Sequence, residues 1–127
     1  MERSSPHCIR VDVQPAYLAH ESNPDERHYV FSYTVTIHNL GTQPVRLLRR
    51  RWLIIDANGE RREVHGDGVV GKQPLIEPGG HFRYTSGALI NTPFGSMEGA
   101  YEMLGDDGSS FEAPIPAFTL AIPGTLH

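Results

Sequence analysis

Apolar and polar side chains alternate with a period of two along much of this chain. The clearest example is His28–Asn39, where aromatic and β-branched residues occupy one face and Ser, Thr and His occupy the other. Alternation of this kind, sustained over the whole range, is typical of a β-strand with one buried face. The pattern therefore predicts a strand that packs one side against a core.

The same pattern predicts further strands, separated by segments rich in Gly, Pro, Asn and Asp. Asn58-Gly59 is the strongest hairpin signal in the chain. Proline cannot donate a hydrogen bond to a neighbouring strand. Pro15 therefore predicts an edge strand or a bulge, and Pro114 and Pro116 predict an edge strand with a break in pairing. The other predicted strands cover residues 8–18, 45–57, 60–65, 81–86, 97–103 and 110–122.

The range 45–57 carries apolar residues on both faces, which predicts a central strand covered on at least one side. Alternation assigns Leu48, Trp52 and Ile54 to one face, together with Arg50. It assigns Leu47, Leu53 and Ile55 to the other face, together with Arg49 and Arg51.

Seven or eight strands without a convincing helix indicate an all-β, immunoglobulin- or fibronectin type III-like antiparallel β-sandwich. The length of 127 residues predicts a single domain over 1–127, with an ordered core of about 8–122. Trp52 and Tyr101 are the candidate core anchors, and sandwiches of this kind bury a tyrosine whose hydroxyl bonds to backbone, the role expected of Tyr101. Cys8 lies on an apolar strand and is expected to be buried.

Composition narrows the functional classes. The net charge of −4 argues against nucleic acid as the main partner, and 39% hydrophobic with 20% charged residues indicates a globular chain. The chain has one cysteine, no run of 18 apolar residues, and no apolar signal-peptide segment in residues 1–6. These features predict a cytoplasmic protein with no membrane partner.

Charge is distributed unevenly along the chain. Six of the eleven basic residues fall between positions 46 and 62, and no Lys or Arg follows Arg83, although five acidic residues do. One interpretation is that the two sets lie on neighbouring strands and neutralise each other. The other is an electropositive face that meets an acidic partner or a phosphate.

A G-x-G-x-x-G pattern is formed by Gly66, Gly68 and Gly71, followed by Lys72. In dinucleotide-binding proteins this pattern follows a buried strand and opens a helix whose amide groups bind pyrophosphate. Here a polar strand precedes it and Pro74 follows it, so the favoured interpretation is a turn-rich crossover between two sheets. The alternative is a weak pyrophosphate nest formed by the glycines and Lys72, aided by Arg61 or Arg62.

Catalytic and metal-binding patterns are weak. The sequence contains no Gly-x-Ser-x-Gly elbow, and Asp106-Asp107 fits a turn better than a catalytic pair. Seven histidines are present, and none has the short spacing to another histidine that marks a metal site. His65, Asp67 and His81 flank the glycine segment and form the least implausible metal set. We assign no catalytic residue, no metal site and no cofactor.

Several long, ordered motifs resemble the ApaG (CorD) family, and the resemblance extends from about Cys8 to Ile122. It implies a fibronectin type III-like sandwich and a stand-alone bacterial protein. Related domains occur in eukaryotic F-box proteins and in a polymerase-interacting protein, where they resemble protein-interaction modules. The motifs are Arg51-Trp52-Leu53-Ile54-Ile55-Asp56-x-x-Gly59, Val64 through Pro74, Pro78-Gly79, Phe82-x-Tyr84-x-Ser86-Gly87, Thr92-Pro93, Gly95-x-Met97-x-Gly99-x-Tyr101-x-Met103, Gly108, Phe111 and Ile115-Pro116-x-Phe118-x-Leu120.

The resemblance and the residues together predict a non-enzymatic module that binds an unidentified protein partner. The glycine segment leaves open an alternative, nucleotide or pyrophosphate binding. The CorD name adds another, an accessory role in cobalt and magnesium tolerance. Genes of the family often lie near that of a diadenosine tetraphosphate hydrolase, which identifies no site in this sequence.

Overall fold

A computed structural model describes residues 7–124 of the chain. The N-terminal segment considered above as a possible signal peptide, residues 1–6, and one of the seven histidines, His127, lie outside the described residues. Two single-turn 3₁₀ segments, Ala19–Glu21 and Pro24–Glu26, occupy the connection after the first strand. The strands are β1 (Ile9–Tyr17), β2 (Tyr29–Asn39), β3 (Val45–Asp56), β4 (Arg61–Asp67), β5 (Leu75–Ile76), β6 (His81–Ile90), β7 (Phe94–Gly105) and β8 (Ser110–Ala121).

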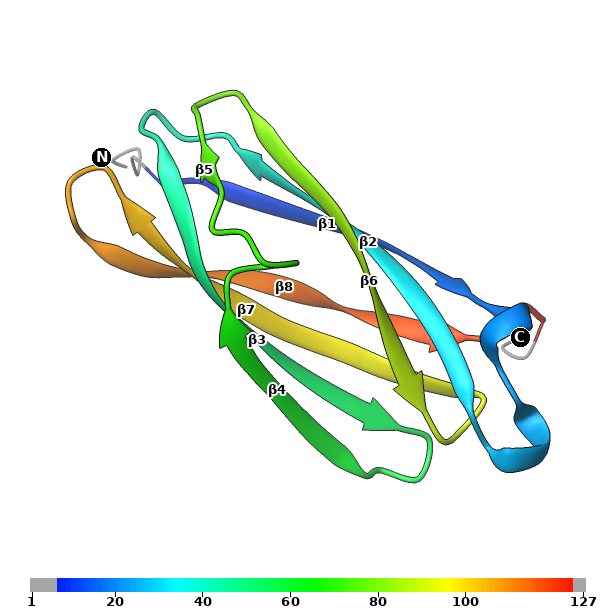
Figure 1. Cartoon of the computed structure of the whole chain (residues 1–127). Coiled ribbons are helices and arrows are strands. Elements are labelled where there is room, and N and C mark those ends of the chain that lie inside the picture. Colours follow the sequence, from blue (N-terminus) through cyan, green and yellow to red (C-terminus); the bar gives the residue numbers. More distant parts are fainter. Residues whose placement is uncertain (1–6, 125–127) are drawn as a thin grey trace, which may run out of the picture.

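The strands form two antiparallel sheets that pack face to face (Figure 1). One sheet has the order β1-β2-β6, and the other has the order β4-β3-β7-β8, with the short β5 paired to the beginning of β3. The predicted all-β antiparallel sandwich is confirmed. No helix within residues 7–124 is long and apolar enough to cross a membrane.

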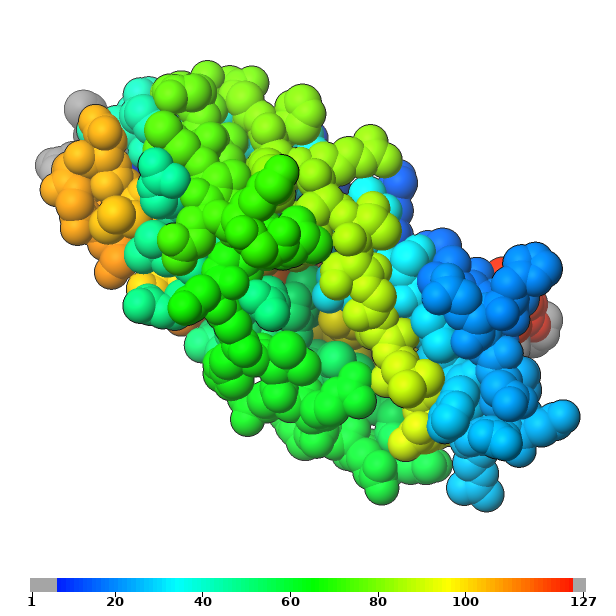
Figure 2. Space-filling view, in the orientation of Figure 1, coloured from blue at the N-terminus to red at the C-terminus, as the bar shows by residue number. Residues whose placement is uncertain are grey.

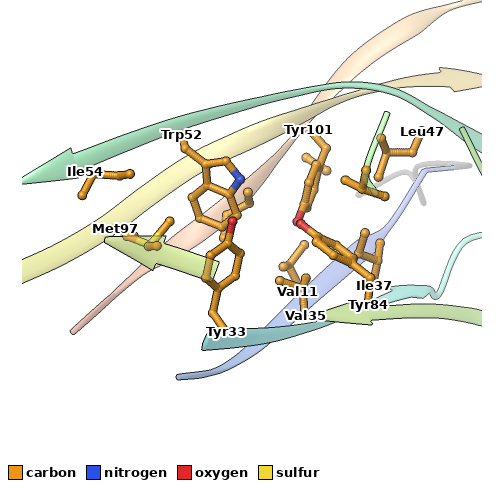
Figure 3. Close-up of a cluster of buried hydrophobic side chains, with 14 of the residues drawn as sticks. Val11, Tyr33, Val35, Ile37, Leu47, Trp52, Ile54, Tyr84, Met97 and Tyr101 are labelled. Carbon is orange, nitrogen blue, oxygen red and sulfur yellow. The ribbon is translucent and has the colours of Figure 1, made fainter. Parts of the chain in front are cut away.

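The core lies between the two sheets and follows from the alternation along β2. Phe31, Val35 and Ile37 are fully buried and Tyr33 is nearly so, whereas Ser32, Thr34 and Thr36 between them are half-buried. Trp52 of β3 lies opposite them, with its ring edge-on to Tyr33 at a centroid distance of 5.2 Å (Figure 3). The aromatic side chains therefore span the sandwich from sheet to sheet.

The predicted faces of β3 are wrong at Leu47. Pairing with β7 shifts between Leu47 and Arg49, so that Leu48 is an extra residue on β3. A bulge of this kind reverses the alternation beyond it. Leu47 is consequently fully buried in the same core as Trp52, and Arg50 also faces the interior side of the sheet.

Cys8 contradicts the expectation of burial, because its side chain is exposed. It precedes β1, which is an edge strand, as Pro15 predicts. Alternation also continues to Val11, which is buried. Cys8 lies on the outward face of this segment with the exposed Arg10 and Asp12, whereas Ile9 and Val11 face the core.

Tyr101 is fully buried, but its hydroxyl does not bond to backbone as expected. It forms a hydrogen bond with the hydroxyl of Tyr84, which comes from the opposite sheet. Burial raises the pKa of both phenols well above the ordinary value. The pair therefore stays protonated and joins the two sheets through the core.

The remaining connections position the surface features. β8 is an edge strand, and its pairing with β7 shifts where Pro116 lies, as the prolines predict. Residues 68–80 run from the end of β4 to the beginning of β6 and so connect the two sheets. The glycine segment is therefore a crossover, with Gly68 and Gly71 in the left-handed region and Gly66 within β4.

Candidate binding site at the glycine segment

Gly66 makes room for an arginine of the neighbouring strand. It pairs with Arg50 across the β3–β4 ladder, and a Cβ atom at Gly66 would lie 2.6 Å from the Arg50 guanidinium. The Arg50 Nη1 donates to the carbonyl oxygens of Asp67, at 3.1 Å, and Gly68, at 2.9 Å. The lack of a side chain at Gly66 thus leaves room for the Arg50 guanidinium, whose hydrogen bonds fix the start of the loop.

Gly68 is required by the loop that follows. Its φ of +62° is in the left-handed region, and a Cβ atom there would collide with the Lys72 carbonyl. Its amide donates to the Leu48 carbonyl at 2.8 Å, and the Gln73 side chain donates to the same oxygen at 3.0 Å. The loop is therefore tied to the bulge of β3.

Residues 69–72 form a tight hairpin turn at the tip of the loop. The Val69 amide donates to the Lys72 carbonyl at 2.8 Å, and the Lys72 amide donates to the Val69 carbonyl at 2.9 Å. The two central residues, Val70 and Gly71, have φ of +45° and +79°. Positive φ at both central positions is the pattern of a type I′ turn, for which Asn-Gly is the preferred pair.

Val70 is an outlier at this position. A β-branched residue in the left-handed region is strained, and such residues cluster at functional sites. The Val70 side chain is 55% exposed, whereas that of the preceding Val69 is fully buried. The loop therefore holds one apolar side chain out from a rigid base.

In this geometry few backbone amide groups of the loop remain free to bind a phosphate. The amides of Gly68, Val69 and Lys72 all donate to carbonyls of the protein, and no helix follows the loop. A pyrophosphate nest would need these amides to point at the anion instead. Lys72 itself is exposed.

The candidate metal residues take different partners. The His65 Nε2 lies 3.9 Å from a Glu63 oxygen, and the Asp67 carboxylate lies 3.6 Å from the Arg49 Nε. His81 belongs to the other sheet, where its ring lies 6.0 Å from that of His38. Within residues 7–124 no group of three His, Cys, Asp or Glu could hold a metal ion.

The basic and acidic residues of the larger sheet partly neutralise each other. Arg49 of β3 donates to Glu102 of the neighbouring β7 at 2.6 Å, and Arg51 approaches Glu112 of β8, across β7, at 3.3 Å. Arg50 and Arg62 form no ion pair with a described residue. Pairing on adjacent strands, the first interpretation of the charge pattern, therefore holds for Arg49, whereas the Arg51 pair spans two strands that are not neighbours.

Sequence reasoning did not single out Val70 or Arg50. The dipeptide Val70-Gly71 occupies the central positions of a turn, but nothing in its composition marks Val70 as a left-handed residue. The alternation placed Arg50 beside Trp52, which was the one available signal that this arginine faces inward.

Comparison with known proteins gives a consistent result. The ApaG domain family matches residues 19–105 of the chain. A protein named ApaG from Shewanella halifaxensis is 55% identical to this chain, and the match covers 94% of each chain. A protein named ApaG from Azoarcus sp. is 50% identical, and that match covers 100% of each chain. A crystal structure of an ApaA protein from Bordetella pertussis is 45% identical, with a TM-score of 0.93 over 97% of this chain and 100% of its own.

Proposed function

This chain belongs to the ApaG family, and we propose that it is a non-enzymatic module that binds a partner protein. The observation that carries the proposal is the strained, exposed Val70 at the tip of a rigid hairpin turn. A protein has no structural reason to hold a β-branched residue in the left-handed region when Asn or Gly would fit without strain. Contact with a partner supplies such a reason.

The surroundings of Val70 support this role. Figure 1 shows the segment between β4 and β5 as a narrow turn that extends from the end of β4 toward β6 and then returns to β5. Farther along the same crossover, Leu75 is 50% exposed, so the segment carries two apolar side chains in contact with solvent. Exposed apolar groups on a pre-organised loop suit a protein interface, because little conformational entropy is lost when the partner binds.

The test compares three baits in an affinity capture from bacterial lysate. The baits are the wild-type chain, Val70→Asn and Leu40→Asn. Asn accepts the left-handed conformation, so Val70→Asn removes the apolar side chain and keeps the turn. Leu40 is 54% exposed in the turn after β2 and serves as the matched control.

We expect a protein that the wild type and Leu40→Asn both recover and that Val70→Asn loses. With that protein purified, Val70→Asn should weaken the affinity by about tenfold or more, the loss of a central apolar contact. Capture that is equal for all three baits would contradict a role for Val70. Recovery of nothing above background at low salt would contradict the interaction module as a whole.

A further inference from the structure

A cleft lies between the edges of β4 and β6, where the sandwich is open. Its volume is about 280 Å³, and Tyr33, Trp52 and Met97 of the core form its inner wall. Residues 86–89 of β6 line one side, and Arg62 and Val64 of β4 line the other. Figure 2 shows the surface hollowed between the green atoms of β4 and the yellow-green atoms of β6.

Two arginines line this cleft, and backbone carbonyls hold both in place. Arg50 is fixed by its bonds at the start of the glycine loop, and the Arg62 Nη2 donates to the Leu89 carbonyl at 3.0 Å across the opening. Carbonyl groups orient a guanidinium without neutralising its charge. Each arginine also keeps further N–H donors that no described residue accepts.

The cleft contains no compensating acid. Neither Asp nor Glu lines it. Asp67, Glu102 and Glu112 line a depression on the outer face of the same sheet, which Arg50 also borders, but none of the three forms an ion pair with Arg50. Asp56 and Glu60 line a neighbouring hollow together with Arg62 and do not pair with it. Two uncompensated positive charges therefore stand beside an aromatic wall.

We propose that this cleft binds a small organic anion, a carboxylate carried on an aromatic or apolar body. Arg62 would pair with the carboxylate at the mouth of the cleft, since guanidinium groups favour this geometry, and Arg50, four pairs farther along the β3–β4 ladder, would add positive charge at the other end. The ring would pack against Trp52, Tyr33 and Met97. Pockets for drug-sized ligands measure roughly 300–1,000 Å³, so a cleft of about 280 Å³ fits a smaller ligand with one ring.

The test is a titration of ¹⁵N-labelled protein with 3-phenylpropionate, followed by NMR. Trp52 is the single tryptophan of the chain, so its indole N–H gives one resonance that reports from the wall of the cleft. We expect this resonance to shift in a saturable way. The neutral 3-phenylpropionamide and the small anion acetate, which lack the charge and the ring respectively, should bind at least tenfold more weakly.

Arginine-to-glutamine variants test which positive charges contribute to binding. Arg62→Gln should weaken 3-phenylpropionate binding by about tenfold or more, and Arg50→Gln, which removes the more distant charge, should weaken it less. Arg51→Gln is the matched control, because Arg51 lies on the same strand as Arg50 but on the outer face, paired with Glu112. Arg62 is exposed at the mouth of the cleft, so its variant remains informative if Arg50→Gln disturbs the loop.

Three results would overturn the proposal. One is an unmoved Trp52 resonance at millimolar 3-phenylpropionate. Another is equal affinity for the carboxylate and its amide, which would show that charge takes no part. The third is an Arg51→Gln variant that binds as weakly as Arg62→Gln, which would reduce the effect to general surface charge.

Discussion

The hydroxyls of Tyr84 and Tyr101 meet at 2.5 Å in the middle of the core and connect the two sheets (Figure 3). Tyr84 comes from β6 and Tyr101 from β7, so the bond crosses the sandwich instead of running along a sheet. Tyr101 is fully buried and Tyr84 is 7% exposed. Each hydroxyl is thus the polar partner that the other needs away from water.

Replacing both members of this pair should cost less than the two single replacements added together. Tyr101→Phe leaves the Tyr84 hydroxyl buried without its partner, and should lower the free energy of unfolding by about 1–3 kcal/mol. The double variant Tyr84→Phe/Tyr101→Phe removes both polar groups and should lose less than the sum of the single losses. Urea denaturation of the four proteins measures this coupling, and additive losses would show that the hydroxyls act independently.

The same pair should make the protein sensitive to alkali. Burial holds the pKa of both tyrosines above the ordinary value of 10.0, so above that pH they ionise in the unfolded chain but not in the folded one. The unfolded state then binds fewer protons than the folded state, and the free energy of unfolding falls as the pH rises. The slope should reach about 1.4 kcal/mol per pH unit for each tyrosine.

Denaturation curves measured from roughly pH 8 to pH 11 would reveal this loss, since the unfolded tyrosines titrate within that range. The double phenylalanine variant is the control, because it lacks both groups and keeps the other titrating residues. Its stability should decline less steeply than that of the wild type. Parallel curves for the two proteins would contradict the assigned direction of the pKa shifts.

Val70→Asn should stabilise the chain even though the proposed function requires Val70. The left-handed conformation costs an ordinary residue about 1–2 kcal/mol, and Asn tolerates it, so we expect the free energy of unfolding to rise by about 1 kcal/mol. Urea denaturation measures the change. A gain in stability together with a loss of partner capture would show that the loss comes from the surface and not from unfolding.

The same substitution at the neighbouring Val69 serves as a comparison. Val69 is fully buried, so Val69→Asn should destabilise the protein, by about 1–3 kcal/mol for an amide buried without partners. If Val70→Asn is also destabilising, the valine packs against the protein in solution and the strain argument is wrong.

Local alternation was sufficient to predict the fold, because the two faces of strands such as β2 differ sharply in polarity. It failed at Leu47, since the bulge at Leu48 depends on how β3 pairs with β7, which lies about fifty residues away in the chain. The expected burial of Cys8 rested on its apolar character and was wrong, because alternation places Cys8 on the same face as the exposed Arg10 and Asp12. Alternation also could not predict the partner of the Tyr101 hydroxyl, because that partner comes from the other sheet.

The candidate site was less predictable for the same reason. The glycine pattern was visible in the sequence, but the structural roles of Gly66 and Gly68 depend on Arg50 and Leu48 of the neighbouring strand. The uncompensated charge of Arg50 can be recognised only when its cross-strand neighbours are known. Period-two patterns identify strands and faces, whereas the contacts that make a site are formed between strands.

The glycine segment should not act as a phosphate nest. The amides of Gly68, Val69 and Lys72 already donate to protein carbonyls, and binding a phosphate would break those bonds. At millimolar ATP, GTP or diadenosine tetraphosphate we therefore expect their NMR resonances to stay in place. Trp52 serves as the internal comparison: a nucleotide that reached the arginine-lined cleft would move the indole resonance without moving the loop amides. Saturable shifts of the three loop amides, lost in Lys72→Gln, would instead restore pyrophosphate binding as the function of this segment, because Lys72 is the basic side chain of the nest.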